Sequence, residues 1–216
     1  MEEKFSNRGG LPVIERLIGT IQENRAYLSE VDGAIGDGDH GVNMAKGFSL
    51  TAERISREMS LSQGLKMLAE TLLTEIGGAM GPLYGSFFGA MAEAGRDRQE
   101  IDARILGQML EAGCAAVIEL GGAKVGDKTL VDTLAPAVEA YRQAQEEGAS
   151  LAEALQRMVR AAEKGKESTK NLVARVGRSS RLGERSRGAL DAGAVSCYLL
   201  LDSLATAISS LLGKEP

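Results

Sequence analysis

Apolar residues recur with the spacing of an α-helix along almost the whole chain, and this periodicity limits the possible folds more than any other feature. No segment shows the sustained alternation of apolar and polar residues that a half-buried β-strand requires. The sequence therefore predicts an all-α protein. The expected helices, eight in number, cover residues 11–29, 41–58, 62–77, 83–95, 101–120, 128–146, 150–174 and 188–213.

Glycine residues cluster in the connections that follow the first, third, fifth and seventh of these helices. Alternate connections of an up-and-down helical bundle lie at the same end of the bundle. We therefore expect four Gly-rich segments to meet on one rim, and we expect the functional site there. No internal repeat or low-complexity linker indicates a second domain, so we predict one domain over residues 1–216. The four segments are residues 33–41, 77–85, 121–126 and 177–193.

Charge and hydropathy exclude several classes of protein. The chain has 25 basic and 30 acidic residues and no stripe of Lys and Arg, so we expect no binding of nucleic acid. We find no apolar stretch of the roughly 18 residues that a membrane span needs, and no signal-peptide core near the N-terminus. We therefore predict a cytoplasmic protein that does not enter a membrane. Cys114 and Cys197 are expected to be buried free thiols.

Three carboxylates fall within eight residues in the segment from Asp32 to Gly41, which reads Asp-Gly-Ala-Ile-Gly-Asp-Gly-Asp-His-Gly. These carboxylates repel one another unless a hard cation such as Mg²⁺ binds between them. Asp37 and Asp39 lie two positions apart, so their side chains can point the same way, and Asp32 can fold back toward them. The next helix begins near Gly41 and presents unpaired N–H groups to the same place. The segment predicts a site for Mg²⁺ and phosphate.

Two other interpretations of this segment are weaker. A calcium-binding EF-hand loop needs a bidentate Glu at its end, but Asn43 and Met44 occupy that region. The aspartates could also simply cap a helix, but one Asp is enough for a cap. His40 is the only histidine, so a mechanism that needs a second histidine must take it from another chain.

The other Gly-rich segments carry weaker signals. The segment from Gly77 to Ser86 could present backbone N–H groups to phosphate at the start of a helix. Asp127, in a Gly-Asp-Lys-Thr sequence, is predicted to cap the helix that begins at residue 128. The last segment carries four arginines opposite the carboxylates, where they could bind phosphates or the acidic face of a partner. They are Arg178, Arg181, Arg185 and Arg187.

Taken in order, these segments resemble the L subunit of dihydroxyacetone kinase and the same domain of related glycerone and tetrulose kinases. The resemblance is carried by Asp-Gly-x-x-Gly-Asp-Gly-Asp-His-Gly, Gly-Ala-x-Gly-Pro-Leu-Tyr-Gly, Gly-Asp-Lys-Thr and Leu-Gly-Glu-Arg-Ser. It extends from about Gly9 to Leu212. It implies an antiparallel, up-and-down barrel of eight helices that binds ADP or ATP at one end.

The resemblance also implies which residues form the site. Asp32, Asp37 and Asp39 would hold two Mg²⁺ ions. It assigns no catalytic side chain, because phosphoryl transfer depends on positioning and on charge neutralisation. The residues that would line the nucleotide are His40, Gly41, Val42, Asn43, Ala79, Met80, Gly121, Leu130, Arg178, Asp191, Ala192 and Gly193.

Three positions depart from the family pattern. Met80 stands where the family often has Ser, so a hydroxyl contact to phosphate is lost there. Leu130 replaces a common Met against the base, and Ala192 replaces the Pro of an Asp-Pro-Gly turn. These departures indicate a divergent member, whose sugar need not be dihydroxyacetone.

The family holds its ketone covalently on a histidine of a separate sugar-binding subunit, the K subunit, which implies that this chain is half of an enzyme. The phosphoryl source would be ATP or a phosphohistidine carrier, the M subunit of the sugar phosphotransferase system. A transcription regulator and a second copy of this chain stay open as further partners. Two other functions also stay open: the nucleotide domain of a fatty acid kinase, and a nucleotide-loaded regulator without enzymatic activity.

Overall fold

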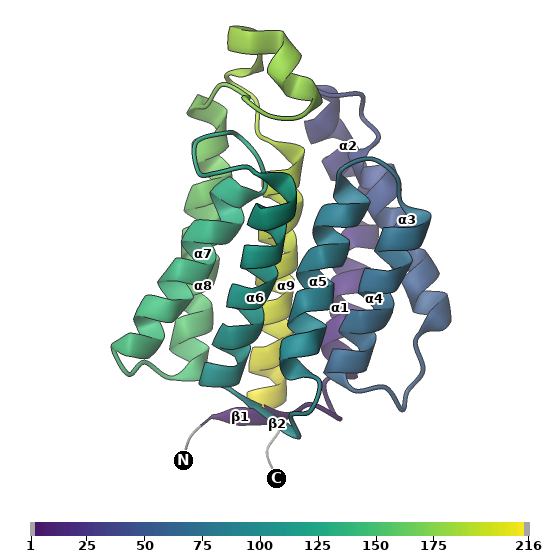
Figure 1. Cartoon of the computed structure of the whole chain (residues 1–216), viewed down its shortest axis with the longest axis vertical. Helices are drawn as coiled ribbons and strands as arrows, with labels where there is room; N and C mark the ends of the chain where they lie inside the picture. Colours follow the sequence, from purple (N-terminus) through teal and green to yellow (C-terminus); the bar gives the residue numbers. More distant parts are fainter. Residues whose placement is uncertain (1–2, 214–216) are drawn as a thin grey trace.

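The structure, a computed structural model, describes residues 3–213 and consists almost entirely of helices (Figure 1). Two short strands and two 3₁₀ segments complete it. The strands are β1 (Lys4–Ser6) and β2 (Glu100–Asp102), and the 3₁₀ segments are η1 (Thr169–Asn171) and η2 (Arg178–Ser186). The α-helices are α1 (Leu11–Glu23), α2 (Arg25–Gly33), α3 (His40–Arg54), α4 (Leu61–Glu75), α5 (Met80–Gly95), α6 (Ala103–Gly121), α7 (Val131–Glu146), α8 (Leu151–Ser168) and α9 (Ala192–Leu212).

The helices form a closed, up-and-down ring, which confirms the predicted all-α class. In chain order α3 to α9 each contact the next helix, α1 contacts α3, and α9 returns to contact α1. We predicted eight helices, but the described residues form nine α-helices, because the first predicted helix is divided into α1 and α2. At Asn24 the backbone leaves the helical region (φ −96°, ψ 9°), so α1 ends and α2 begins in a new direction.

The core is built from aliphatic side chains, with a small group of aromatic rings around Phe88. Helix α9 lies near the middle of the view in Figure 1 and packs against α1, α7 and α8. Cys114 and Cys197 are buried free thiols, as predicted.

Helix α9 corrects one expectation. By length and composition alone it is long and apolar enough to cross a membrane, so the statement that no such stretch exists was wrong. In the structure it packs as a core helix, with residues such as Val195, Leu200 and Ile208 buried. A buried core helix passes the same test of length and composition.

Several predicted helix ends differ from those in the structure. The helix expected from residue 128 begins at Val131, because Lys128 has a positive φ of 63° and cannot continue a helix. Asp127 does not cap this helix; its carboxylate accepts a hydrogen bond from Lys124 N (3.0 Å). Asp132 shapes the loop instead, by accepting from Gly126 N (2.6 Å) and Thr129 N (2.7 Å). The helix predicted over 150–174 ends at Ser168, and that predicted over 188–213 begins at Ala192.

The two strands pair antiparallel at the end of the ring opposite the rim, with Phe5 opposite Ile101. Each strand is three residues long, too short to show an alternating pattern in the sequence. Asn7, which follows β1, is buried and links β1 to the end of α5 and to the connection between α5 and β2. Its side-chain amide donates to Gly95 O (3.0 Å) and Arg98 O (2.7 Å).

All four Gly-rich segments lie at the other end, as predicted (Figure 1). The α2–α3, α4–α5 and α6–α7 connections and η2 form this rim. Arg175 N donates to Asp127 O (3.1 Å), which joins the segment before η2 to the α6–α7 connection.

Candidate metal centre and adjoining pocket

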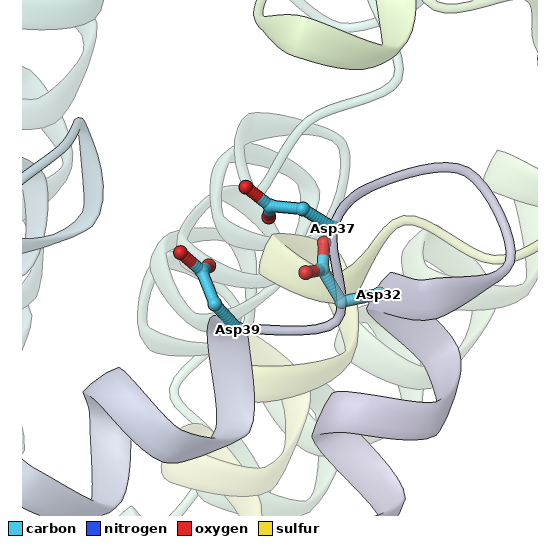
Figure 2. A group of neighbouring side chains, drawn as sticks. All are labelled: Asp32, Asp37 and Asp39. Atoms are coloured by element: carbon cyan, nitrogen blue, oxygen red, sulfur yellow. The ribbon is translucent and has the colours of Figure 1, made fainter.

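Asp32, Asp37 and Asp39 form a compact cluster of carboxylates on the rim. One ligand oxygen from each lies within 4.8 Å of the others. Figure 2 shows the side chains of Asp37 and Asp39 extending in the same direction from the loop, with Asp32 beside them at the end of α2. The structure therefore brings together the three residues that the sequence singled out.

The two glycines within the loop allow this arrangement. A side chain at Gly36 would meet the Asp32 carboxylate, with its Cβ only 2.4 Å from Oδ1. Gly38 has a φ of +76°, which side-chain-bearing residues rarely adopt. Asp32 Oδ2 in turn accepts a hydrogen bond from His40 N (3.3 Å), which ties the end of α2 to the start of α3.

Arg178 of η2 supplies positive charge to this cluster. Its guanidinium donates to the Asp37 carboxylate and lies 3.8 Å from that of Asp39. The side chains remain about half exposed, so solvent screens the pair. Carboxylate oxygens at this spacing are the ligands that Mg²⁺ prefers, and exposed acids leave room for water and phosphate ligands. The residues present therefore fit a magnesium site.

An apolar pocket of about 300 Å³ opens on the same rim, between the start of α5, the end of α6 and the start of α7. Its walls include Ala79, Gly121 and Leu130, three residues predicted to line a nucleotide. Leu120 and Val176 add exposed apolar surface at its edge. A flat, largely apolar group such as a purine base suits a pocket of this kind.

The remaining predicted residues lie around these two features. His40 to Asn43 form the first turn of α3, with Val42 exposed and Asn43 half-buried. Gly41 is buried. A Cβ atom at this position would lie only 2.0 Å from Arg25 O of α2, so the close packing of α2 against α3 requires a glycine here. Met80 is the first residue of α5 and is half-buried.

The Asp191–Gly193 turn starts α9 and lies next to the pocket. The Asp191 carboxylate accepts from Ala194 N (2.8 Å) and so caps the helix. Ala192 is buried, and a side chain at Gly193 would lie 3.5 Å from Leu130. Burial raises the pKa of Asp191 to about 6, and its hydrogen bond to Ala194 and the nearby Lys128 oppose the shift.

Sequence reasoning missed the role of Lys128. Its side chain is 1% exposed, and Nζ donates to Thr169 O and Ala189 O, both at 2.5 Å. Burial lowers the pKa of Lys128, and the charge of Asp191 opposes this shift. The lysine thus joins the two ends of the segment that carries η2. Its neighbours in Gly-Asp-Lys-Thr gave no indication of this role, because a loop lysine is usually exposed.

His40 also has an environment that the sequence did not predict. Its Nε2 atom lies 2.9 Å from Ser196 Oγ of α9. Burial lowers the pKa of the His40 imidazole, and the Asp32 carboxylate works in the opposite direction. Ser196 and its neighbour Tyr84 were assigned no role from the sequence, although Tyr84 belongs to the Gly-Ala-x-Gly-Pro-Leu-Tyr-Gly motif.

A family model, the DAK2 domain, matches residues 34–206, which include Asp37 and Asp39 of the carboxylate cluster, the pocket and most of α9, whereas Asp32 lies just before the matched range. The chain belongs to the DAK2 family. It resembles the ADP-binding subunit DhaL of the PEP-dependent dihydroxyacetone kinase of Escherichia coli, with 43% identity over 84% of this chain and 87% of that protein. It is 40% identical to the ADP-binding subunit DhaL of the PTS-dependent kinase of Lactococcus lactis, over 85% of this chain and 88% of that one.

The DAK2 fold is also present in a solved structure. The crystal structure of the dihydroxyacetone kinase of C. freundii in its native form superposes with a TM-score of 0.68 and 25% identity. The match covers 90% of this chain but only 33% of the other, so this DAK2 chain spans about a third of that kinase. A second structure of that kinase, in complex with AMP-PNP and Mg²⁺, gives a TM-score of 0.65. The resemblance to the L subunit and the all-α fold it implied are confirmed.

Proposed function

We propose that this chain is the nucleotide-binding subunit of a dihydroxyacetone-type kinase, which passes a phosphoryl group to a ketose held on a separate subunit. One observation carries the proposal. Three carboxylates with oxygens within 4.8 Å of one another share a rim with an apolar pocket of about 300 Å³. Such a rim can take the phosphates and the base of one adenine nucleotide. The names of the relatives support the same activity.

In this proposal Asp32, Asp37 and Asp39 hold two Mg²⁺ ions, and the nucleotide is ADP or ATP. The pocket residues Ala79, Gly121 and Leu130 would contact the base. The first turns of α3 and α5 would present backbone N–H groups to phosphate. The full set of proposed nucleotide contacts is His40, Gly41, Val42, Asn43, Ala79, Met80, Gly121, Leu130, Arg178, Asp191, Ala192 and Gly193.

The chain's own residues contribute position and charge. Bound Mg²⁺ would supply neutralisation of the negative charge that spreads over the phosphoryl oxygens during transfer. The carboxylates would fix where that positive charge lies; Asp32 is held at the end of α2, Asp39 directly before α3, and Asp37 in the loop between them. The guanidinium of Arg178, in η2, contacts the Asp37 carboxylate and could move from it to a phosphate. The pocket keeps the nucleotide in one orientation relative to an incoming acceptor.

The acceptor must come from another chain. The only histidine, His40, directly follows Asp39 of the carboxylate cluster and has its Nε2 atom against Ser196, so it is not available to capture a ketone. We propose a sugar-binding K subunit as the partner, and as phosphoryl source either ATP or a phosphohistidine carrier, the M subunit. We also propose that residues 1–216 act as a single domain in the cytoplasm.

Reconstitution tests the proposal. The purified chain with Mg·ATP and dihydroxyacetone should form no sugar phosphate above background. Addition of a sugar-binding subunit from a related kinase, with the phosphohistidine carrier where needed, should give turnover that depends on this chain. Phosphorylation by the isolated chain, or no turnover in any mixture, would contradict the proposed division of labour.

A further inference from the structure

A line of hydrogen bonds connects His40 to the interior of the barrel. His40 is the first residue of α3, Tyr84 lies in α5 and Ser196 lies in α9. His40 Nε2 is 2.9 Å from Ser196 Oγ, and Ser196 Oγ is 2.7 Å from Tyr84 Oη. Both hydroxyls also lie near Gly193 O, at 3.1 Å from Ser196 and 3.2 Å from Tyr84.

The surroundings hold the two hydroxyls in place. Ser196 is fully buried and Tyr84 is 2% exposed. The Tyr84 ring stacks on Phe88, with the ring centroids 6.3 Å apart. Enclosed hydroxyls keep their partners because an unpaired buried polar group is costly. The hydrogen bonds that join His40, Ser196 and Tyr84 are therefore a fixed part of the barrel. Of these three residues, His40 lies next to the carboxylate cluster, where its backbone N–H donates to Asp32.

The positions of the protons decide what His40 can do. The 2.7 Å contact between the two hydroxyl oxygens places a proton between them, and either hydroxyl can supply it. If Tyr84 supplies it, Ser196 can donate its own proton to His40 Nε2 or to Gly193 O; if Ser196 supplies it, Tyr84 can donate to Gly193 O. When Ser196 donates to Nε2, the imidazole proton is on Nδ1; in the other arrangements it is on Nε2. Nδ1 has no hydrogen-bond partner within residues 3–213 and is not an enclosed atom.

The expected ligand distinguishes the two cases. Phosphate oxygens accept hydrogen bonds and do not donate them. Ser196 contacts Nε2, so a neutral imidazole can donate a hydrogen bond to a phosphate oxygen only if its proton is on Nδ1. The proton is on Nδ1 when Tyr84 donates to Ser196 Oγ and Ser196 donates to His40 Nε2.

We propose that Ser196 and Tyr84 are positioning residues that hold His40 in its Nδ1–H tautomer, as a neutral hydrogen-bond donor to a phosphate oxygen of the bound nucleotide. This inference rests on the proposed function for the identity of the ligand. It assigns a role to two buried residues outside the predicted nucleotide contacts.

The tautomer can be read without any ligand. The chain has a single histidine, so the side-chain ¹⁵N spectrum of labelled protein reports on His40 alone. We expect the Nδ1–H tautomer at neutral pH. Ser196→Ala should convert the ring to the Nε2–H tautomer, which is the commoner form of a free imidazole. A wild-type ring already in the Nε2–H form would overturn the inference.

The chain offers a matched control for each substitution. Ser203 lies on the same helix, is 2% exposed, and its Oγ accepts from Thr20 Oγ1 at 2.9 Å. Tyr141 is 1% exposed and donates to Ala103 O at 2.8 Å, at the start of α6 and away from the rim. Ser203→Ala and Tyr141→Phe therefore remove a buried hydroxyl without touching the line to His40.

Calorimetry with Mg·ADP then tests the function of the line. Ser196→Ala and Tyr84→Phe should each raise the dissociation constant by about tenfold, the effect of losing one hydrogen bond to a charged group. Ser203→Ala and Tyr141→Phe should keep the wild-type affinity. Failure of the wild-type chain to bind Mg·ADP contradicts the proposed function. Wild-type affinity and tautomer in Ser196→Ala contradict this inference alone.

Discussion

The guanidinium of Arg178 lies against the carboxylate of Asp37, although 141 residues separate them in the chain. The contact joins η2 to the loop between α2 and α3. It gives the carboxylate cluster a positive neighbour, which the proposed function assigns to the phosphates of the nucleotide.

Arg178→Gln should change two affinities in opposite directions. The guanidinium competes with a cation for Asp37, so its removal should tighten the binding of Mg²⁺ alone. It would also be lost as a phosphate ligand, so the dissociation constant for Mg·ADP should rise by roughly tenfold. Calorimetry measures both affinities. Arg181→Gln, an exposed arginine of the same segment, is the control and should change neither. Weaker binding of both ligands would contradict this account of the pair.

Lys128→Met should destabilise the fold by about 3 kcal/mol, because two carbonyls lose a charged donor inside the protein. Methionine has a similar length and fills most of the space. Urea unfolding measures the loss. Lys124→Met changes an exposed lysine of the same connection and should have little effect. Equal stability of the two variants would show that Lys128 does not hold the ends of the η2 segment together.

Asp191 should make stability depend on pH. Burial raises its pKa to about 6 from an ordinary value of 3.8, so the folded state keeps a proton that the unfolded state releases. Its contribution to stability is therefore largest below pH 4 and falls as the pH rises to about 6. Asp191→Asn lacks this titration. The stability of the variant relative to wild type should increase by about 2 kcal/mol between pH 4 and pH 6. Parallel pH profiles in urea unfolding would contradict the raised pKa.

Mg·ADP should protect the chain against heat. A ligand at 100 times its dissociation constant stabilises the native state by about 2.7 kcal/mol, which corresponds to roughly 5–10 °C for a chain of this size. EDTA should remove most of this gain, because the carboxylates repel the phosphates without a cation. Full protection by ADP in the presence of EDTA would argue against a metal-dependent site.

The sequence allowed the helical fold and the rim to be predicted because both depend on repeated signals. Helical periodicity covers most of the chain, and glycines mark alternate connections. The break at Asn24 was not predictable, since an asparagine within a helix is only mildly unfavourable. Lys128 was missed because its burial depends on carbonyls at Thr169 and Ala189, which are distant in the chain.

The cluster of three carboxylates was easier to predict than the buried hydroxyl groups that contact His40. Asp32, Asp37 and Asp39 are close in sequence, so their crowding is visible without a structure. Ser196 and Tyr84 come from other helices, and only the packing of α5 and α9 brings them to His40. Local spacing thus predicts the carboxylates of the proposed metal site, whereas the contacts of Ser196 and Tyr84 with His40 depend on tertiary structure.

Native mass spectrometry of the purified chain with Mg²⁺ and ADP tests the central claim most directly. The account predicts one dominant complex whose added mass equals one ADP and two Mg²⁺ ions. Asp37→Asn should lose this complex while staying folded, because the substitution removes a charge from an exposed loop. Asp97→Asn, at an exposed site on the opposite end, should keep it. A wild-type chain that takes up no nucleotide, or an Asp37→Asn chain that takes up both metal ions, would contradict the account.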